Sequence, residues 1–399
     1  MNTNWDENVR RVVPYTPGEQ PKETDVIKLN TNENPYPPAP AVRKILDGFD
    51  VSQMRLYPAP DADVLVNAIA GTYSVKPSRV FVGVGSDDVI SMAFMTFFNS
   101  DKPIFFPDIT YSFYDVWADV YRIPYETKPL RSDFTIDPED YKKPNGGIIF
   151  PNPNAPTGVL ESVEMIEDIV RANPDSVVMI DEAYIDFGGK SCLPLIEKYD
   201  NLLVIQTFSK SRSMAGMRIG FAMGSEKLIR YMNDVKFSVN SYTMNTITQL
   251  CGAAAVKDTE YFDSTVAKIV ETREQTKETL AEMGFTFPDS MSNFIFAKPP
   301  KKSAEYVFSE LKKQKIYVRW WNKPVIKDYL RISIGTPEEM DRFIAALKGG
   351  RSARGALCER QRRLIFALKF RLTAKEMPIL TRRSAFSTIC SPLCRFTAR

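Results

Sequence analysis

The chain has 399 residues, of which 44% are hydrophobic and 25% are charged, and its formal net charge is +3, a composition typical of globular proteins. It contains no histidine, which excludes a Ser-His-Asp hydrolase, disfavours most zinc enzymes and leads us to expect no metal site. No apolar run is long enough to cross a membrane, the N-terminus lacks the core of a signal peptide, and the five cysteines lack paired spacing, so we expect a cytoplasmic protein without a membrane partner.

Short apolar runs alternate with helical patterns between about residues 60 and 225. A strand followed by a helix and another strand is the unit from which parallel sheets are built. The sequence therefore predicts an α/β fold whose large domain has a mostly parallel sheet. The runs that read as strands are 80–82, 103–106, 147–150, 177–180 and 202–205.

Residues 81–90, Phe-Val-Gly-Val-Gly-Ser-Asp-Asp-Val-Ile, read as a strand, a glycine turn and a helix that opens at Ser86 and Asp87. Backbone N–H groups at the start of a helix form an anion site. Many turns look like this one, so the segment alone is weak evidence.

Residues 150–158, Phe-Pro-Asn-Pro-Asn-Ala-Pro-Thr-Gly, leave a strand as a rigid loop, because the prolines prevent regular structure. The amide side chains of this loop, including that of Asn154, are available to a ligand. The next apolar run ends in Asp181, Glu182 and Tyr184. Open α/β sheets bind ligands at the carboxyl ends of their strands, and a buried aspartate there could keep a pyridine nitrogen protonated.

Residues 207–220 place Lys210 beside hydroxyl side chains, with Arg218 between two glycines eight residues later. A lysine can form an imine with an aldehyde, and hydroxyls with a guanidinium can hold a phosphate. Pyridoxal 5'-phosphate (PLP) carries both groups. The alternative is a surface lysine on a serine-rich turn. The later strands, 293–297, 316–319 and 329–334, follow a helical stretch around 258–283 and predict a smaller α+β domain.

In this order, the segments resemble those of the fold-type I PLP-dependent aminotransferases. Five further segments are similar to the histidinol-phosphate aminotransferase branch, and the resemblance covers roughly residues 5–348. These segments are 13–18, 29–37, 55–58, 107–114 and 330–336.

The resemblance implies a role for several residues around the cofactor. Lys210 would bind PLP covalently and, once displaced, move a proton on the substrate; Asp181 would face the pyridine nitrogen and Tyr184 the ring oxygen. Tyr111 would stack on the ring. The cofactor phosphate would be held by Ser86, Asp87, Thr207, Ser209 and Arg218, and by Tyr57 of a neighbouring subunit, which implies a homodimer.

One position departs from the family pattern. The family has asparagine directly before Pro-Thr-Gly, but this chain has Ala155 there, preceded by Asn154. Either Asn154 takes the role at the ring oxygen or Tyr184 holds that oxygen alone. By resemblance, Arg331 would grip the α-carboxylate of the amino donor, and Arg319 and Tyr15 are candidates for the phosphate end of a substrate.

The expected function is transfer of an amino group between histidinol phosphate and 2-oxoglutarate, in histidine biosynthesis. The rivals are an aromatic amino acid aminotransferase, a threonine-phosphate decarboxylase and a non-catalytic PLP-binding protein. The partners expected are thus small molecules, namely a phosphorylated amino alcohol and glutamate or 2-oxoglutarate, and no nucleic acid, since no nucleic-acid module is recognisable.

The expected domains are an N-terminal arm (1–45) that folds back onto the small domain, a large PLP-binding domain (46–255), a small domain (256–348) and a basic tail (349–399). The tail has 12 Lys and Arg against 2 Asp and Glu, which leaves 40 against 47 in the first 348 residues. This shift in charge indicates that the tail is a disordered or non-native extension of a mildly acidic enzyme.

Overall fold

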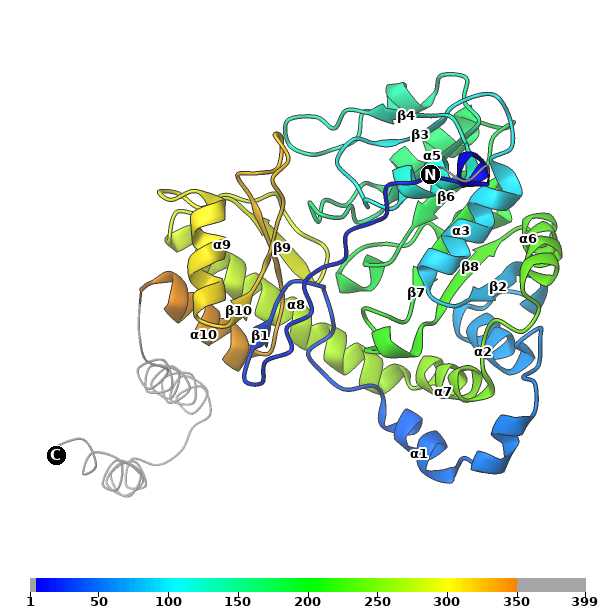
Figure 1. The fold of residues 1–399 in the computed structure, drawn as a ribbon, viewed down its shortest axis with the longest axis horizontal. Helices are drawn as coiled ribbons and strands as arrows, with labels where there is room; N and C mark the ends of the chain where they lie inside the picture. Colours follow the sequence, from blue (N-terminus) through cyan, green and yellow to red (C-terminus); the bar gives the residue numbers. More distant parts are fainter. Residues whose placement is uncertain (1–4, 350–399) are drawn as a thin grey trace, which may run out of the picture. The chain divides into compact units, whose positions relative to one another are not determined.

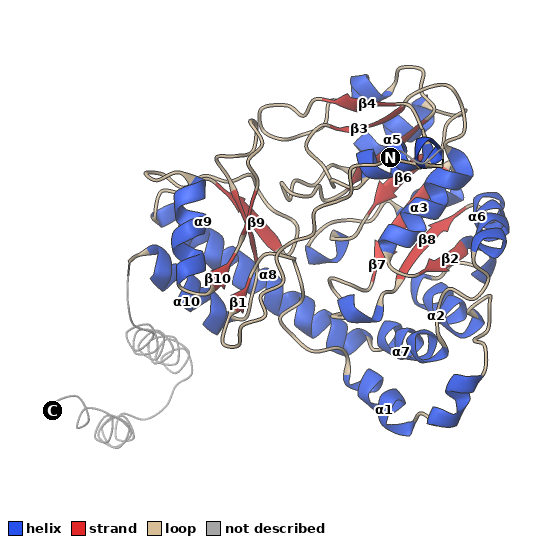
Figure 2. Ribbon diagram, viewed as in Figure 1, coloured by secondary structure: helices blue, strands red, loops and turns tan. Residues whose placement is uncertain are grey.

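The computed structural model describes residues 5–349, and the residues up to Met340 form one compact unit. Its larger sheet has the strand order β2-β8-β7-β6-β5-β3-β4 (Figures 1 and 2). Strand β8 runs antiparallel to β2 and β7, and the remaining neighbours are parallel. The prediction of a mostly parallel sheet is confirmed, although β4 and β8 were not among the predicted strands. The strands are β2 (Val80–Gly83), β3 (Ile104–Pro107), β4 (Tyr125–Lys128), β5 (Gly147–Pro151), β6 (Val178–Asp181), β7 (Leu202–Thr207) and β8 (Gly220–Gly224).

Helices cover both faces of this sheet, because alternate strand residues point to opposite faces. Ile148 and Phe150 of β5 pack in one hydrophobic cluster, and Ile149 between them packs in the other. The first cluster includes residues of α1 (Pro40–Gly48), α2 (Asp63–Tyr73), α5 (Val163–Ala172) and α7 (Thr246–Lys257). The second includes residues of α3 (Ser86–Phe97), α4 (Tyr114–Tyr121) and α6 (Glu226–Val239). The central strands are therefore buried on both faces, as their continuous apolar sequences predicted.

Helix α8 (Thr259–Glu282) connects the large sheet to the smaller ones (Figure 1). Asp258 ends α7 and caps α8, accepting a hydrogen bond from the backbone N–H of Tyr261. Farther along, α8 packs against both the short helix η5 (Ile185–Phe187) and β9 (Phe294–Ala297). The predicted helix around residues 258–283 is confirmed.

Two small sheets follow. Strands β11 (Arg319–Trp320), β12 (Leu330–Ser333) and β9 form an antiparallel sheet, and β1 (Ile27–Lys28) pairs in parallel with β10 (Ile316–Tyr317). Through β1, the chain near residue 27 pairs with this later region. The prediction of a single strand at 316–319 is wrong, because β10 and β11 belong to different sheets. The remaining α-helices are α9 (Ala304–Lys313) and α10 (Pro337–Leu347).

Short 3-10 helices complete the described chain. Apart from η5 they are η1 (Asp6–Asn8), η2 (Val51–Arg55), η3 (Pro77–Arg79), η4 (Pro138–Tyr141), η6 (Leu193–Glu197) and η7 (Ala215–Met217). Among the described helices, none is both long and apolar enough to span a bilayer. The predicted basic tail lies, apart from its first residue, outside the described residues.

Candidate active site

A cavity of about 400 Å³ brings together residues from six parts of the chain. The N-terminal segment, the loop after β3, the proline-rich loop, the ends of β6 and β7, and the β11–β12 region each contribute to its wall. The predicted site residues that line it are Tyr15, Tyr111, Tyr184, Lys210, Arg319 and Arg331.

Lys210 lies in the turn that follows β7, and its amine opens on the cavity. The Nζ atom donates to the carbonyl oxygen of Thr31 at 3.2 Å and lies 5.7 Å from the centre of the Tyr184 ring. The Asn34 side chain fixes the backbone here by donating to the carbonyls of Lys210 and Ser211. The lysine therefore has a fixed backbone and an amine that can react with a ligand.

Asp181 is the last residue of β6 and is buried. Its carboxylate accepts hydrogen bonds from the Tyr114 hydroxyl and the Ala183 backbone N–H, both at 3.1 Å. Burial raises the pKa of Asp181 from its ordinary value near 3.8 to about 6, against the lowering effect of these two bonds. A cationic ring nitrogen beside it would restore the charged form.

The start of α3 meets β8 at very close range. A Cβ atom on Gly220 would lie 2.3 Å from both the Gly85 carbonyl carbon and the Ser86 nitrogen, so only glycine allows this approach. Arg218 packs on the same turn, since a Cβ on Gly85 would lie 2.4 Å from its Nη2. The helix start and the guanidinium together form a concave surface of donors suited to a phosphate.

Hydroxyl groups and a carboxylate border this surface. Thr207 pairs with Gly220 across the sheet, and its Oγ1 lies 3.0 Å from the Oγ of Ser209. Asp87 accepts a hydrogen bond of 2.7 Å from the Tyr111 hydroxyl and lies 3.4 Å from Arg218. Tyr111 also lines the cavity. Its hydrogen bond to Asp87 therefore connects the donor surface at the start of α3 to the cavity that Lys210 lines.

Tyr184 receives its hydrogen bond from a residue that the sequence analysis did not single out. The Asn32 side-chain amide donates to the Tyr184 hydroxyl at 3.0 Å, and the phenolic hydrogen is then available to a group in the cavity. Asn154, by contrast, donates to the Ile109 carbonyl and to Thr157, each at 3.0 Å, while Ala155 lines the cavity. Asn32 lies within the segment 29–37. The family resemblance of that segment is the one feature of the sequence that could have identified Asn32 as a site residue.

Two arginines face the cavity from paired positions on β11 and β12. Arg319 is opposite Arg331 in the register, and Trp321 lies 5.3 Å from the first guanidinium and 5.2 Å from the second. Arg319 donates to the carbonyls of Thr16 and Pro17 at 3.2 and 3.3 Å.

Arg331 is the more enclosed of the two guanidiniums. It donates to the Asn30 carbonyl at 2.9 Å, but its buried Nε has no hydrogen-bond partner among the described residues. Burial lowers the pKa of Arg331, and the nearby charge of Arg319 adds to the effect. Two neighbouring cations with unused donors form a site for an anion.

Tyr15 and Tyr57 have different positions. Tyr15 lines the cavity and stacks on Phe113 with 4.1 Å between ring centres. Tyr57 is 82% exposed and packs beside Tyr242, away from the cavity of its own chain. The described residues of one chain therefore give Tyr57 no contact with the site.

The site fits PLP by its chemistry. Three residues of the cavity wall, Arg331, Thr110 and Asn30, each have a buried polar side-chain atom without a partner among the described residues, which suits a polar ligand. Lys210 supplies an amine, Asp181 a buried carboxylate and the start of α3 an anion site. Within the described residues no cluster of side chains suits a metal ion.

Comparison with known proteins places these residues in a family context. The family model described as aminotransferase class I and II matches residues 24–347. The histidinol-phosphate aminotransferase of Lactococcus lactis subsp. cremoris (strain MG1363) is 50% identical over 345 residues, which are 86% of this chain and 97% of that protein. The histidinol-phosphate aminotransferase of Clostridium botulinum (strain Langeland / NCTC 10281 / Type F) is 48% identical over 348 residues, or 87% and 98% of the two chains.

Solved structures share the fold at lower identity. The histidinol-phosphate aminotransferase from Clostridium acetobutylicum superposes with a TM-score of 0.75 at 22% identity, covering 81% of this chain and 98% of that chain. The enzyme of the same name from Sinorhizobium meliloti, in complex with pyridoxal-5'-phosphate, has a TM-score of 0.74 at 23% identity, covering 81% and 89%. At these identities the solved structures show a common fold.

Proposed function

The chain belongs to the class I and II aminotransferase family, and from this premise we propose that it is a PLP-dependent enzyme that transfers the amino group between histidinol phosphate and 2-oxoglutarate, in histidine biosynthesis. The observation that supports this substrate is the pair Arg319 and Arg331. These two cations line the cavity and are distinct from the anion surface at the start of α3. A phosphorylated substrate needs this second site. Glutamate, which carries carboxylates, can use the same arginines.

PLP, when bound, supplies an aldehyde that bonds to amines and a protonated ring that withdraws electrons from the neighbouring carbon. The Lys210 amine would hold the cofactor covalently, and the same amine, when free, would take a proton from the substrate carbon that bears nitrogen. Its contact with the Thr31 carbonyl holds the amine beside the cavity.

Other residues hold the cofactor and set its charge. Asp181 would keep the ring nitrogen protonated through charge pairing, and the Tyr184 hydroxyl, which accepts from Asn32, would donate its own hydrogen to the ring oxygen. Tyr111 would cover the ring face. Because both Asn154 donors bind the chain itself, Tyr184 is the better candidate for the ring oxygen.

The phosphate of the cofactor is assigned to the surface where α3 meets β8. Its ligands in this proposal are the backbone N–H groups of Ser86 and Asp87, the hydroxyls of Thr207 and Ser209, and the guanidinium of Arg218. Helix-terminal N–H groups and a guanidinium fork both match phosphate geometry.

We propose in addition that the working unit is a cytoplasmic homodimer in which Tyr57 reaches the phosphate of the partner subunit's cofactor. The support is the exposure of Tyr57 together with that of Val51, Met54 and Leu56 around it. An apolar surface of this kind is typical of an interface between subunits. Sedimentation equilibrium would give the oligomeric state, and Tyr57→Phe should weaken cofactor retention only if the dimer forms.

A substrate panel tests the proposed reaction. With 2-oxoglutarate as acceptor, kcat/KM for histidinol phosphate should exceed that for phenylalanine by at least about a hundredfold, equivalent to about 2.7 kcal/mol. Two guanidiniums strongly favour a phosphate dianion over a neutral ring.

Variants assign that preference to the arginines. Arg319→Ala should shrink the gap by roughly tenfold or more through the phosphorylated substrate. Lys327→Ala, in the loop between β11 and β12 but off the cavity wall, should leave the gap unchanged. Equal turnover of phenylalanine by the wild type would instead support the aromatic aminotransferase. Release of carbon dioxide from threonine phosphate would support the decarboxylase, and cofactor binding without any turnover would support the non-catalytic protein.

A further inference from the structure

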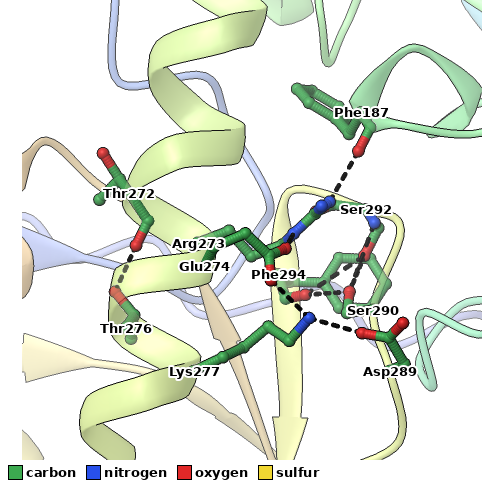
Figure 3. Close-up of polar contacts among 10 residues, drawn as sticks. All are labelled: Phe187, Thr272, Arg273, Glu274, Thr276, Lys277, Asp289, Ser290, Ser292 and Phe294. Carbon is green, nitrogen blue, oxygen red and sulfur yellow. Dashed lines mark hydrogen bonds and ion pairs between the residues drawn. The ribbon is translucent and has the colours of Figure 1, made fainter.

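In the turn between α8 and β9, residues 290–293, the side chains of Ser290, Ser292 and Asn293 are buried. Figure 3 shows the hydrogen bonds around Ser290 and Ser292. The Ser290 and Ser292 hydroxyls lie 2.9 Å apart, and Ser290 also donates to the Phe294 carbonyl at 2.5 Å. Both side chains are fully enclosed. These hydrogen bonds and the enclosed side chains hold the backbone of the turn in one conformation.

This turn binds three segments that border the cavity. The Met291 backbone N–H donates to the Gly158 carbonyl at 2.9 Å, and the Ile334 N–H donates to the Asn293 carbonyl at 2.8 Å. The Asn293 side-chain amide donates to the Asn32 carbonyl at 3.0 Å. The turn thus ties together the proline-rich loop, the strand that carries Arg331, and the residue that binds Tyr184.

Asn32 connects the turn 290–293 to Tyr184, because it is bound by Asn293 and donates to the Tyr184 hydroxyl. Its backbone has a positive φ of 56°, a left-handed conformation that asparagine adopts more readily than most residues. Ser333 fixes it by accepting from the Asn32 N–H at 2.9 Å and donating to its Oδ1 at 2.8 Å. With its backbone held by Ser333 and Asn293, Asn32 has one orientation from which it reaches the Tyr184 hydroxyl.

Arg273 of α8 holds the turn and the Tyr184 segment at the same time. Its Nη1 donates to the Phe187 carbonyl at 2.7 Å and to the Ser292 carbonyl at 3.0 Å, as Figure 3 shows. Phe187 ends the short helix η5, which begins directly after Tyr184. The Arg273 side chain is only 3% exposed, and Glu274 balances its charge at 2.7 Å.

We propose that Arg273 is a positioning residue for Tyr184, acting through Phe187 on one side and through Ser292, Asn293 and Asn32 on the other. A buried guanidinium bound to two carbonyls leaves both unsatisfied when it is removed, so the two segments lose their common anchor. The inference rests on the proposed function, because it concerns the hydroxyl assigned to the cofactor's ring oxygen.

The test compares Arg273→Met with Lys277→Met in the full chain loaded with PLP. Lys277 lies one turn along the same helix and contacts Glu274 and Asp289, but neither Phe187 nor Ser292 (Figure 3). It controls for the loss of a largely enclosed positive charge on this helix. The readouts are the pH midpoint of the bound cofactor's visible absorbance, the dissociation constant of PLP and the thermal midpoint of the cofactor-free protein.

We expect Arg273→Met to shift the pH midpoint by about half a unit or more, since a hydrogen bond to the charged form of a group sets its pKa. The dissociation constant of PLP should rise about tenfold, a change of about 1.4 kcal/mol. Arg273→Lys should lie between wild type and Arg273→Met, because an ammonium lacks the planar fork. Lys277→Met should lower the thermal midpoint and leave both cofactor readouts unchanged.

An Arg273→Met protein that loses thermal stability but keeps the wild-type pH midpoint would overturn the proposal. If Arg273→Met does not fold, Asn293→Ser decides, since it breaks the same connection farther along: a shifted midpoint supports the proposal and an unshifted one overturns it. None of these readouts needs a substrate. A wild-type protein that binds PLP but does not convert histidinol phosphate would therefore refute the proposed substrate alone.

Discussion

At the scale of single residues, the two groups proposed for the chemistry, Lys210 and Asp181, make few contacts with the rest of the protein. Lys210 makes one hydrogen bond through its amine, to a backbone carbonyl. Asp181 has two donors and a buried carboxylate whose pKa is raised to about 6. Among the described residues neither group forms an ion pair, as expected where a ligand completes the site.

Replacing Lys210 with alanine should abolish turnover while leaving a folded protein. Because the same amine binds the cofactor and moves the proton, both half-reactions should slow by several orders of magnitude. Single-turnover absorbance measurements with glutamate and with 2-oxoglutarate would check this. Lys301→Ala, at an exposed position, is the control. Retention of a substantial part of the rate by Lys210→Ala would show that the lysine is misassigned.

Asp181→Asn should change how stability depends on pH in the cofactor-free protein. A carboxyl whose pKa is higher in the folded than in the unfolded state costs nothing below about pH 4, where both states are protonated; the cost grows up to about pH 6 and is fully present above it. The variant should thus exceed the wild type by about 1–3 kcal/mol in unfolding free energy at pH 8 and by nothing at pH 4.

Denaturant titrations at the two pH values measure this difference. With PLP present the order should reverse, since the wild-type carboxylate then has a cationic partner and the amide does not. If the difference in unfolding free energy between the variant and the wild type is the same at both pH values, burial of the ionised Asp181 carboxylate does not destabilise the folded state.

At the scale of elements, the close approach of β8 to α3 shapes the anion surface. Strand β8 is the antiparallel member of the large sheet, and its first residue, Gly220, packs against the backbone of Gly85 and Ser86. The contact fixes the backbone at the start of α3, where the first N–H groups have no acceptor within the helix. Geometry of this kind has little tolerance, because backbone atoms cannot move aside as flexible side chains can.

Gly220→Ala should therefore destabilise the protein by about 1–3 kcal/mol and also weaken PLP binding, because the added methyl pushes α3 away from β8. Gly71→Ala is the matched control. Gly71 is exposed inside α2, and an added Cβ would meet nothing within 4 Å. It should raise stability by about 0.5–1 kcal/mol and leave PLP affinity unchanged. Thermal unfolding and cofactor titration of both variants test this, and unchanged PLP affinity in Gly220→Ala would contradict the assigned phosphate site.

At the scale of the whole molecule, the described residues contain every side chain assigned to the site in one subunit. The family match ends at residue 347, where α10 also ends, and Gly349 follows with a positive φ of 78°. The basic segment beyond has a different charge balance from the rest of the chain.

A chain truncated after Gly350 should therefore keep its activity and its oligomeric state. Steady-state rates and sedimentation of the truncated and full-length proteins would show this. A soluble truncated protein that has lost activity would mean that the basic segment belongs to the enzyme.

The sequence by itself determined the local structure and the family. Continuous apolar runs predicted β2, β3, β5, β6 and β7, since burial on both faces leaves that pattern in the sequence. Motif order predicted the aminotransferase family, which the comparisons confirm. Lys210 and Asp181 could be proposed as candidates because Asp181 ends one recognisable strand and Lys210 lies in the turn after another.

Tertiary structure alone decided which groups meet. Asn32 reaches Tyr184 across 152 residues of sequence, and Arg273 joins Phe187 to Ser292 from a helix between them. Nothing in the periodicity of either segment encodes its partner. The same holds for Asn154, whose donors turn to Ile109 and Thr157. Hydropathy patterns report whether a side chain is buried, whereas a hydrogen bond depends on the directions of two groups that only the folded backbone brings together.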